Sequence, residues 1–242
     1  MISIFKRREI VLDCITNAAH AYDYAPIRRA SKFLPSWWMD LPPNPKIEGD
    51  LFTPLNMRGC PGFSDLYSVG VMMPMWSDLR IDLAPNGEYR YQYSDSISSA
   101  EAHGEEQRGR FAEGGKYSHI KLAAPWLFKT KDDIGWLMLP AFYNNEDPAQ
   151  YLTCLGALNF VYQHAVNVNL LMPLSPDRKL IEFKHGSPLA HLVPLTDKKI
   201  KIRNHLVDES EWRRLSGKHR RISFSRNYHA IKKVKKDGCP FA

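Results

Sequence analysis

The stretch from residue 120 to residue 195 constrains the fold most, because short apolar segments alternate there with turn signals at brief intervals. Ser175-Pro176-Asp177 and His185-Gly186 are two of these turn signals, and their residue types favour chain reversal. Strands spaced this closely are typical of a sandwich or barrel, whereas βαβ units need helical stretches between the strands. The pattern therefore predicts antiparallel strands. We expect six of them, at residues 122–128, 134–139, 151–160, 166–172, 179–183 and 188–195.

The N-terminal half continues the same pattern. We expect strands at 9–16, 69–73, 79–83 and 88–93, and the Asn86-Gly87 pair predicts a hairpin turn between the last two. Residues 94–119 are polar and contain several glycines, so they predict a long surface excursion. The fold class that follows is mainly β, an antiparallel barrel or sandwich with few short helices.

One helix is predicted late in the chain, near residues 208–216. Asp208 can serve as the N-cap, and Glu211 stands three residues later, as in a capping box. This helix lies within a strongly basic region. Residues 198–242 hold 14 Lys and Arg against 4 Asp and Glu, a net charge of +10, whereas residues 1–197 hold 19 against 22 and carry −3. We therefore divide the chain into a β-rich core domain at 1–197, which begins with an aromatic segment, and a basic C-terminal extension at 198–242.

Composition excludes several classes of protein. With 44% hydrophobic and 24% charged residues, the chain resembles neither a disordered protein nor a polytopic membrane protein. No apolar run approaches the roughly 20 residues of a membrane helix, and the first residues lack the apolar region of a signal peptide. The four cysteines have no CxxC spacing, which favours reduced thiols. We expect a cytoplasmic protein without membrane contact.

Two blocks carry a family resemblance. The first runs from Gly156 to His164 (GALNFVYQH) and is followed by alternating Val166, Val168 and Leu170; the second is the segment IEFKHGSPLAHLVP at 181–194. Together they resemble the dUTPase and dCTP-deaminase superfamily, which implies a β-clip fold. The same blocks, with CPGFSDLY at 60–67, are also similar to a group of proteins encoded by tailed phages.

The sequence departs from that family at the positions that carry its activity. The resemblance places Asn159 where the family has a catalytic Asp, and a carboxamide cannot act as a general base at neutral pH. Ala141 and Phe142 follow Pro140 where the family has the Arg-Ser pair of its Pro-Arg-Ser-Gly motif. We therefore assign no catalytic residue and lean away from an enzyme. We also expect no cofactor, and no metal, because His164, His185 and His191 lack ligand spacing.

Three sets of candidate residues follow, each with a structural alternative. The ligand-binding candidates are Asn159, Tyr162, Gln163, His164 and His191, whose alternative is packing at a strand edge. The candidates for phosphate or nucleic-acid binding are Lys198, Lys199, Lys201, Arg203, Arg213, Arg214, Arg220 and Arg221, whose alternative is docking on an acidic surface. The interface candidates are Trp37, Trp38, Met72, Met73 and Trp76, whose alternative is core packing.

Three functional hypotheses stay open at this stage. The first is a non-catalytic, homo-oligomeric phage protein, a virion component or accessory binding protein, for which the dUTPase resemblance implies a trimer and other virion proteins as partners. The second is a nucleotide-binding or nucleotide-hydrolysing enzyme that uses the residues around Asn159. The third is nucleic-acid binding through the basic extension, since clustered Lys and Arg can neutralise phosphates.

Overall fold

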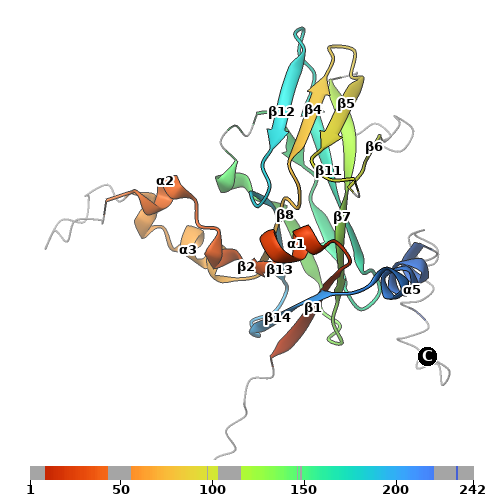
Figure 1. Cartoon of the computed structure of the whole chain (residues 1–242). Coiled ribbons are helices and arrows are strands. Elements are labelled where there is room, and N and C mark those ends of the chain that lie inside the picture. The colour runs from red at the N-terminus through yellow and green to blue at the C-terminus, as the bar shows by residue number, and fades with distance from the viewer. Residues whose placement is uncertain are drawn as a thin grey trace, which may run out of the picture.

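The computed structural model describes residues 9–42, 56–96, 98–102, 116–145, 147, 149–220 and 233, and the side chains of 218–220 are not described. The architecture is mainly β with short helices, which confirms the predicted fold class. Three sheets form the body (Figure 1). No helix in the described ranges is long and apolar enough to cross a membrane.

The largest sheet has six strands in the order β14-β1-β7-β11-β9, with β6 also pairing with β7. Its strands are β1 (Ile10–Thr16), β6 (Ala100–Ala102), β7 (Tyr117–Lys129), β9 (Leu152–Thr153), β11 (Ala165–Pro173) and β14 (Ile200–Leu206). All of its pairs are antiparallel except β1 with β14, which run parallel over seven residues. The strands predicted between residues 120 and 195 pair antiparallel, as expected, and the parallel pair lies outside that region.

The other two sheets are antiparallel throughout. The five-stranded sheet has the order β10 (Gly156–Leu158), β8 (Trp136–Pro140), β13 (Pro188–Pro194), β3 (Val71–Pro74) and β2 (Arg28–Arg29). The three-stranded sheet has the order β12 (Lys179–Phe183), β4 (Leu79–Leu83) and β5 (Tyr89–Tyr93). The hairpin predicted at Asn86-Gly87 is confirmed: Gly87 has φ +86° and its N–H donates to the carbonyl of Ala84.

The single strand predicted at 151–160 was wrong. β9 pairs with β11 in the six-stranded sheet, whereas β10 pairs with β8 in the five-stranded sheet, so the chain changes sheets between residues 153 and 156. Residues 159–163 then form a helical turn, in which the carbonyl of Asn159 accepts from the N–H groups of Tyr162 and Gln163. The excursion predicted at 94–119 is also shorter than expected, because β6 and the start of β7 fall inside it; residues 103–115 lie outside the described ranges.

The helices lie around the sheets. They are α1 (Ala19–Tyr24), α2 (Ser36–Met39), α3 (Pro61–Ser68), α5 (Glu209–Arg220) and the 3₁₀ turns Ala30–Lys32, Met57–Gly59 and Phe142–Asn144. Figure 1 shows α2 and α3 projecting from one side of the body and α5 at the end of β14. The capping predicted for the late helix is confirmed, since Asp208 Oδ1 accepts from the backbone N–H of Glu211 at 2.8 Å.

A large apolar core lies between the sheets. Its largest fully buried side chains include Trp76, Trp126, Trp136, Phe128 and Phe160. Phe160 stacks on Phe128 at a centroid distance of 5.0 Å and contacts Trp136 at 5.3 Å, which ties the 159–163 turn to both larger sheets. Packing of this kind accounts for the stability of the body, because each buried aromatic ring removes a large apolar area from water.

Candidate polyanion-binding face

The basic residues of β14 face away from the core. In β1, Ile10, Leu12 and Cys14 are fully buried, so the alternating residues of that strand point to the opposite face. The parallel register places Lys201 beside Val11, Arg203 beside Asp13 and His205 beside Ile15. Neighbours in register share a face, and all three β14 residues are exposed.

β7 adds a further cation to this face. Its register places Lys129 opposite Asp13 on the side away from Arg203. Neighbouring strands lie about 4.8 Å apart, so Lys129 and Arg203 each lie one strand spacing from Asp13, on opposite sides of it. Asp13 Oδ1 also contacts His205 Nε2 at 2.8 Å. We call these five residues, Asp13, Lys129, Lys201, Arg203 and His205, the basic face; one carboxylate stands there among three permanent cations.

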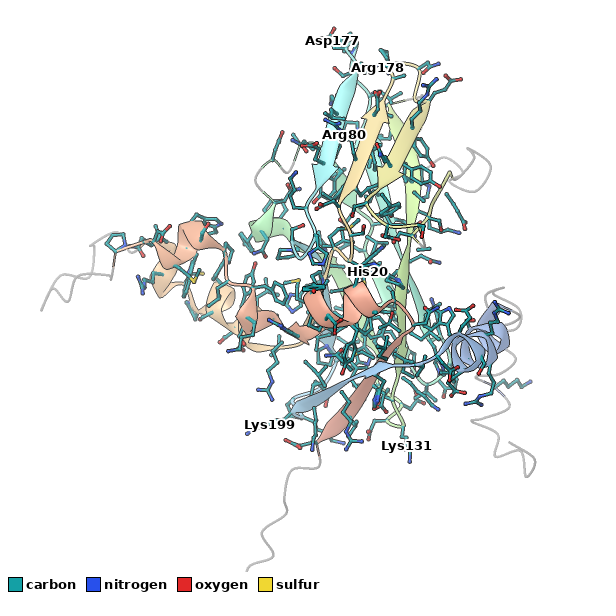
Figure 2. The ribbon with its side chains drawn as sticks, in the orientation of Figure 1. His20, Arg80, Lys131, Asp177, Arg178 and Lys199 are labelled. Atoms are coloured by element: carbon teal, nitrogen blue, oxygen red, sulfur yellow. The ribbon has the colours of Figure 1, made fainter. Side chains whose placement is uncertain are left out.

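A cavity lies beside the beginning of β14. It has a volume of about 240 Å³ and is lined by Arg29, Ser68, Val69, Gly70, Pro194, Thr196, Asp197, Lys198, Lys199 and Ile200. The carbonyl of Lys199 accepts from the N–H of Ile10 at 2.9 Å, which fixes this end of β14 on β1. Figure 2 shows Lys199 near the start of β14 and Lys131 at the turn after β7, both at the same end of the body. Positive charge thus continues from the basic face around the strand ends.

The strand cations and the helix cations differ in their partners. Lys129, Lys198, Lys199, Lys201 and Arg203 take part in no ion pair with the residues that the structure describes. Their charge is therefore available to an external anion.

On α5, by contrast, Arg213 pairs with Glu209 at 2.8 Å and Arg214 pairs with Glu211. The hydrogen bond from Arg213, and a second from Asn17, lower the pKa of the Glu209 carboxyl below its usual value. The predicted charge of these two arginines is thus locally balanced. Arg220 ends α5 with a side chain that is not described, and Arg221 lies outside the described residues.

The expected ligand-binding residues at 159–164 occupy a closed turn. Asn159 and Tyr162 are only 8% and 4% exposed. Asn159 Nδ2 donates to Asp133 Oδ1 at 2.6 Å, and the Tyr162 hydroxyl donates to Asp133 Oδ2 at 2.9 Å. Gln163 is exposed, and the carbonyl of His164 accepts from the N–H of Phe128. Asn159 and Tyr162 thus come together through Asp133, which was not among the predicted ligand-binding residues.

His191 has a different hydrogen-bond partner from that turn. It is on β13, 3% exposed, and its Nε2 contacts the carbonyl oxygen of Val69 at 2.9 Å. Burial lowers the pKa of His191 below its usual value, and the carbonyl of Val69 opposes part of that change. Of the five ligand-binding candidates, Asn159 and Tyr162 thus share Asp133, whereas His191 is held by the backbone of Val69.

The interface candidates divide into two groups. Met72, Met73 and Trp76 are fully buried, which favours their core alternative. Trp38 stacks on Phe63 at 5.2 Å, whereas Trp37 remains 42% exposed although its Nε1 donates to the carbonyl of Tyr143. The tryptophan pair thus anchors α2 and α3 on the body and leaves one ring accessible.

Sequence reasoning identified Lys198, Lys199, Lys201 and Arg203 but missed Arg29 and Lys129, which only tertiary pairing brings to the same end of the molecule. Within the described ranges, no group of three or more His, Cys, Asp or Glu could hold a metal ion. In comparisons with protein-family models, with curated proteins and with solved structures, nothing matches this chain.

Proposed function

We propose that the protein is a non-catalytic nucleic-acid-binding protein that holds the phosphate backbone on the basic face. The observation that carries this proposal is the contrast between strand and helix cations: Lys201 and Arg203 are exposed without an ion-pair partner among the described residues, whereas Arg213 and Arg214 are paired. Rigid strand positions hold these charges at fixed spacing. A regular row of phosphates is the polyanion that such an array fits.

The affinity for nucleic acid should fall with salt concentration by a defined amount. Each cation that neutralises a phosphate releases counterions, so the logarithm of the association constant falls with the logarithm of salt concentration by about 0.7–0.9 per contact. Lys129, Lys201 and Arg203 alone then account for a slope of about −2 to −3. Contacts to phosphate carry no sequence information, so the binding should depend little on base sequence.

Fluorescence anisotropy with labelled single-stranded and double-stranded DNA, measured over a range of NaCl concentrations, tests this proposal. The Lys201→Ala/Arg203→Ala variant should bind more weakly and lose about 2 units of slope. Arg213→Ala/Arg214→Ala is the matched control, because it removes two arginines whose charges are already balanced by Glu209 and Glu211. No binding by the wild type at low salt, or equal losses in both variants, would refute the proposal.

The hydrolytic alternative has less support. Asn159 and Tyr162 are buried and hydrogen-bond Asp133, so neither side chain is presented to a substrate. A thermal-shift screen of nucleotides tests this alternative directly, since a ligand at 100 times its Kd stabilises the folded state by about 2.7 kcal/mol. The phage origin, the virion role and the dUTPase relationship implied by the resemblance stay predictions, and a search for the protein in purified virions tests the second of them.

A further inference from the structure

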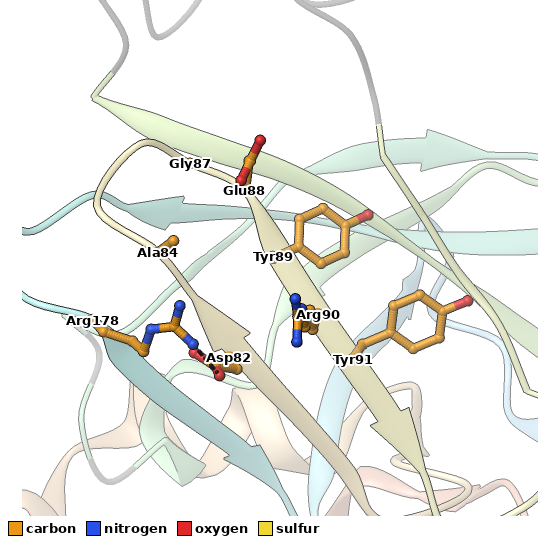
Figure 3. A pocket seen from close by; sticks show the side chains of 8 residues that line it. All are labelled: Asp82, Ala84, Gly87, Glu88, Tyr89, Arg90, Tyr91 and Arg178. Carbon is orange, nitrogen blue, oxygen red and sulfur yellow. Dashed lines mark hydrogen bonds and ion pairs between the residues drawn. The ribbon is translucent and has the colours of Figure 1, made fainter.

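β5 is an edge strand of the three-stranded sheet. The order β12-β4-β5 leaves its far side without a partner strand in the part of the chain that the structure describes. A hollow of about 570 Å³ follows this edge and is lined by the consecutive residues 87–91, together with Asp82, Ala84 and Arg178. Figure 3 shows Tyr89 and Tyr91 side by side along the strand, with an ion pair between Asp82 of β4 and Arg178, which directly precedes β12. With respect to the described residues, the edge is thus open from Gly87 to Tyr91.

The hydrogen bonds to β4 determine which backbone groups point outward. Ser94 N–H donates to the carbonyl of Asp78 at 3.0 Å, and Ala84 N–H donates to that of Glu88 at 2.8 Å. Hydrogen-bonded and non-hydrogen-bonded pairs alternate in an antiparallel ladder. Between those two ends, the register therefore assigns the bonded positions to Arg90 and Gln92.

The backbone N–H and C=O groups of the remaining three residues, Tyr89, Tyr91 and Tyr93, then face the open edge. β5 is five residues long, contains no proline and has no register shift against β4. An edge of this kind is a template for a further strand.

We propose that two copies of the chain associate through β5, paired antiparallel about a two-fold axis at Tyr91. In this register, Tyr91 pairs with Tyr91 of the partner copy, and Tyr89 pairs with Tyr93 of the partner copy. All three outward-facing residues of each copy then hydrogen-bond, which gives six backbone hydrogen bonds across the axis. The two three-stranded sheets become one continuous sheet of six strands.

Side chains favour this register over the neighbouring one. Arg90 lies opposite Gln92 of the partner copy, so no two like charges face each other. An axis at Arg90 instead would place two guanidinium groups directly opposite each other, which is destabilising. The tyrosines of β5 already contact one another along the strand, at centroid distances of 6.4 and 5.9 Å. The two-fold axis extends this row across both copies on the same face, and it covers the Tyr91 ring, which is 42% exposed.

The opposite edge of the sheet, at β12, is protected. Its outward backbone groups belong to Leu180 and Glu182, because β4 uses the alternate residues for its ladder. A symmetric pairing about Ile181 would set Arg178 against Lys184 of the partner copy. Asp82 pairs with Arg178 and Glu182 pairs with Lys184, but both cations are mostly exposed, and charged side chains on an edge strand discourage edge pairing. The association is therefore specific to β5.

Sedimentation equilibrium of the full chain tests this inference, with Tyr91→Pro as the first variant. Proline at this position removes an outward N–H and leaves the ladder with β4 intact. The wild type should be a dimer at micromolar concentration, and Tyr91→Pro should raise the dissociation constant at least about tenfold, the equivalent of losing roughly 1.4 kcal/mol. Leu180→Pro is the matched control, since it places the same residue at an outward position of the opposite edge and should stay dimeric.

A second variant keeps the test decisive if proline unfolds the sheet. The symmetric pair at residue 91 has an expected Cα separation of about 5.5 Å, which suits a disulfide. Oxidised Tyr91→Cys should therefore run as a covalent dimer on non-reducing gels, whereas the wild type and Leu180→Cys should not. A wild type that stays monomeric up to about 100 μM, a trimer, or cross-linking equal in both cysteine variants would overturn the proposal.

Discussion

The hydroxyl of Tyr162 donates a hydrogen bond to Asp133 Oδ2 over 2.9 Å, and this bond joins two turns that lie 29 residues apart. Asn159 donates to the other oxygen of the same carboxylate at 2.6 Å. One aspartate therefore satisfies two buried side chains that the sequence had suggested as ligand-binding candidates. The arrangement indicates a structural role for the turn at 159–163.

Asp133→Ala should lower the free energy of unfolding by about 2–3 kcal/mol, because it leaves the buried Asn159 amide and Tyr162 hydroxyl without this acceptor. Asp132→Ala is the matched control, because no side-chain hydrogen bond or ion pair of Asp132 is observed within the described residues. We expect that control to change stability by less than about 0.5 kcal/mol. Urea denaturation of both variants measures the difference, and equal effects would contradict the structural role.

Gly70→Ala should be more costly than Gly186→Ala, although both glycines have positive φ, +74° and +77°. A Cβ at Gly70 would lie 2.3 Å from the carbonyl oxygen of Leu192, whereas a Cβ at Gly186 meets nothing within 4 Å. The second substitution therefore carries only the backbone strain of about 1–2 kcal/mol. The first adds a clash with backbone, and we expect a total loss of about 3 kcal/mol or more.

Thermal or chemical denaturation of these two glycine variants gives the comparison directly. The difference between their losses of stability measures how closely the segment before β3 packs against β13. If the two variants lose the same stability, β3 and β13 do not approach each other as closely as the structure indicates.

Local patterns predicted much of this fold. Short apolar segments bounded by turn signals placed β4 and β12 with correct boundaries, at Leu79–Leu83 and Lys179–Phe183. The capping residue Asp208 placed the start of α5 equally well. These elements carry their signal in a few consecutive residues, because the period of a strand and the cap of a helix are local properties.

Such local patterns could not predict which distant strands pair with each other. Residues 151–160 are uniformly suited to a strand, but their two halves bond to strands of different sheets. The parallel pairing of β14 with β1 joins residues 190 positions apart and brings Arg203 beside Asp13. Composition predicted the basic charge correctly. Its position on a rigid sheet edge, and the contribution of Lys129, depend on tertiary contacts.

His191 should make stability depend on pH in a defined direction. Burial lowers its pKa in the folded state, so below the unfolded value of 6.5 the unfolded chain binds a proton that the folded chain does not. The free energy of unfolding is therefore highest above pH 6.5 and falls as pH decreases toward the folded pKa, by at most about 1.4 kcal/mol per pH unit. Above pH 6.5 this residue contributes no pH dependence.

Urea denaturation of the wild type and of His191→Gln between pH 8 and pH 5 tests this direction, since the other histidines are common to both proteins. The wild type should lose more stability than the variant on acidification. Identical pH profiles would show that His191 titrates normally in the folded state.

Two truncations of the basic extension, one before β14 and one after it, should differ in their effect on stability and on DNA binding. A chain that ends after Thr196 loses this strand, and with it Ile200 and Ile202, which pack against the core, and the parallel partner of β1. Ile10 and Leu12 on β1 then lose their neighbours at a sheet edge. We expect a loss of more than about 4 kcal/mol, equivalent to a decrease in Tm of roughly 10 °C or more.

A chain that ends after Val207 keeps β14 and the bond from Val207 N–H to the carbonyl of Thr16 at 2.9 Å. It loses α5, whose polar link to the body includes the exposed bond between Asn17 and Glu209. We expect a decrease in stability below about 2 kcal/mol and retention of the salt-dependent DNA binding that the strand cations supply. Calorimetry and anisotropy on the two truncations separate these effects. If the chain that ends after Thr196 binds DNA as the wild type does, β14 is not the binding surface. If that chain melts at the wild-type temperature, β14 is not a core strand.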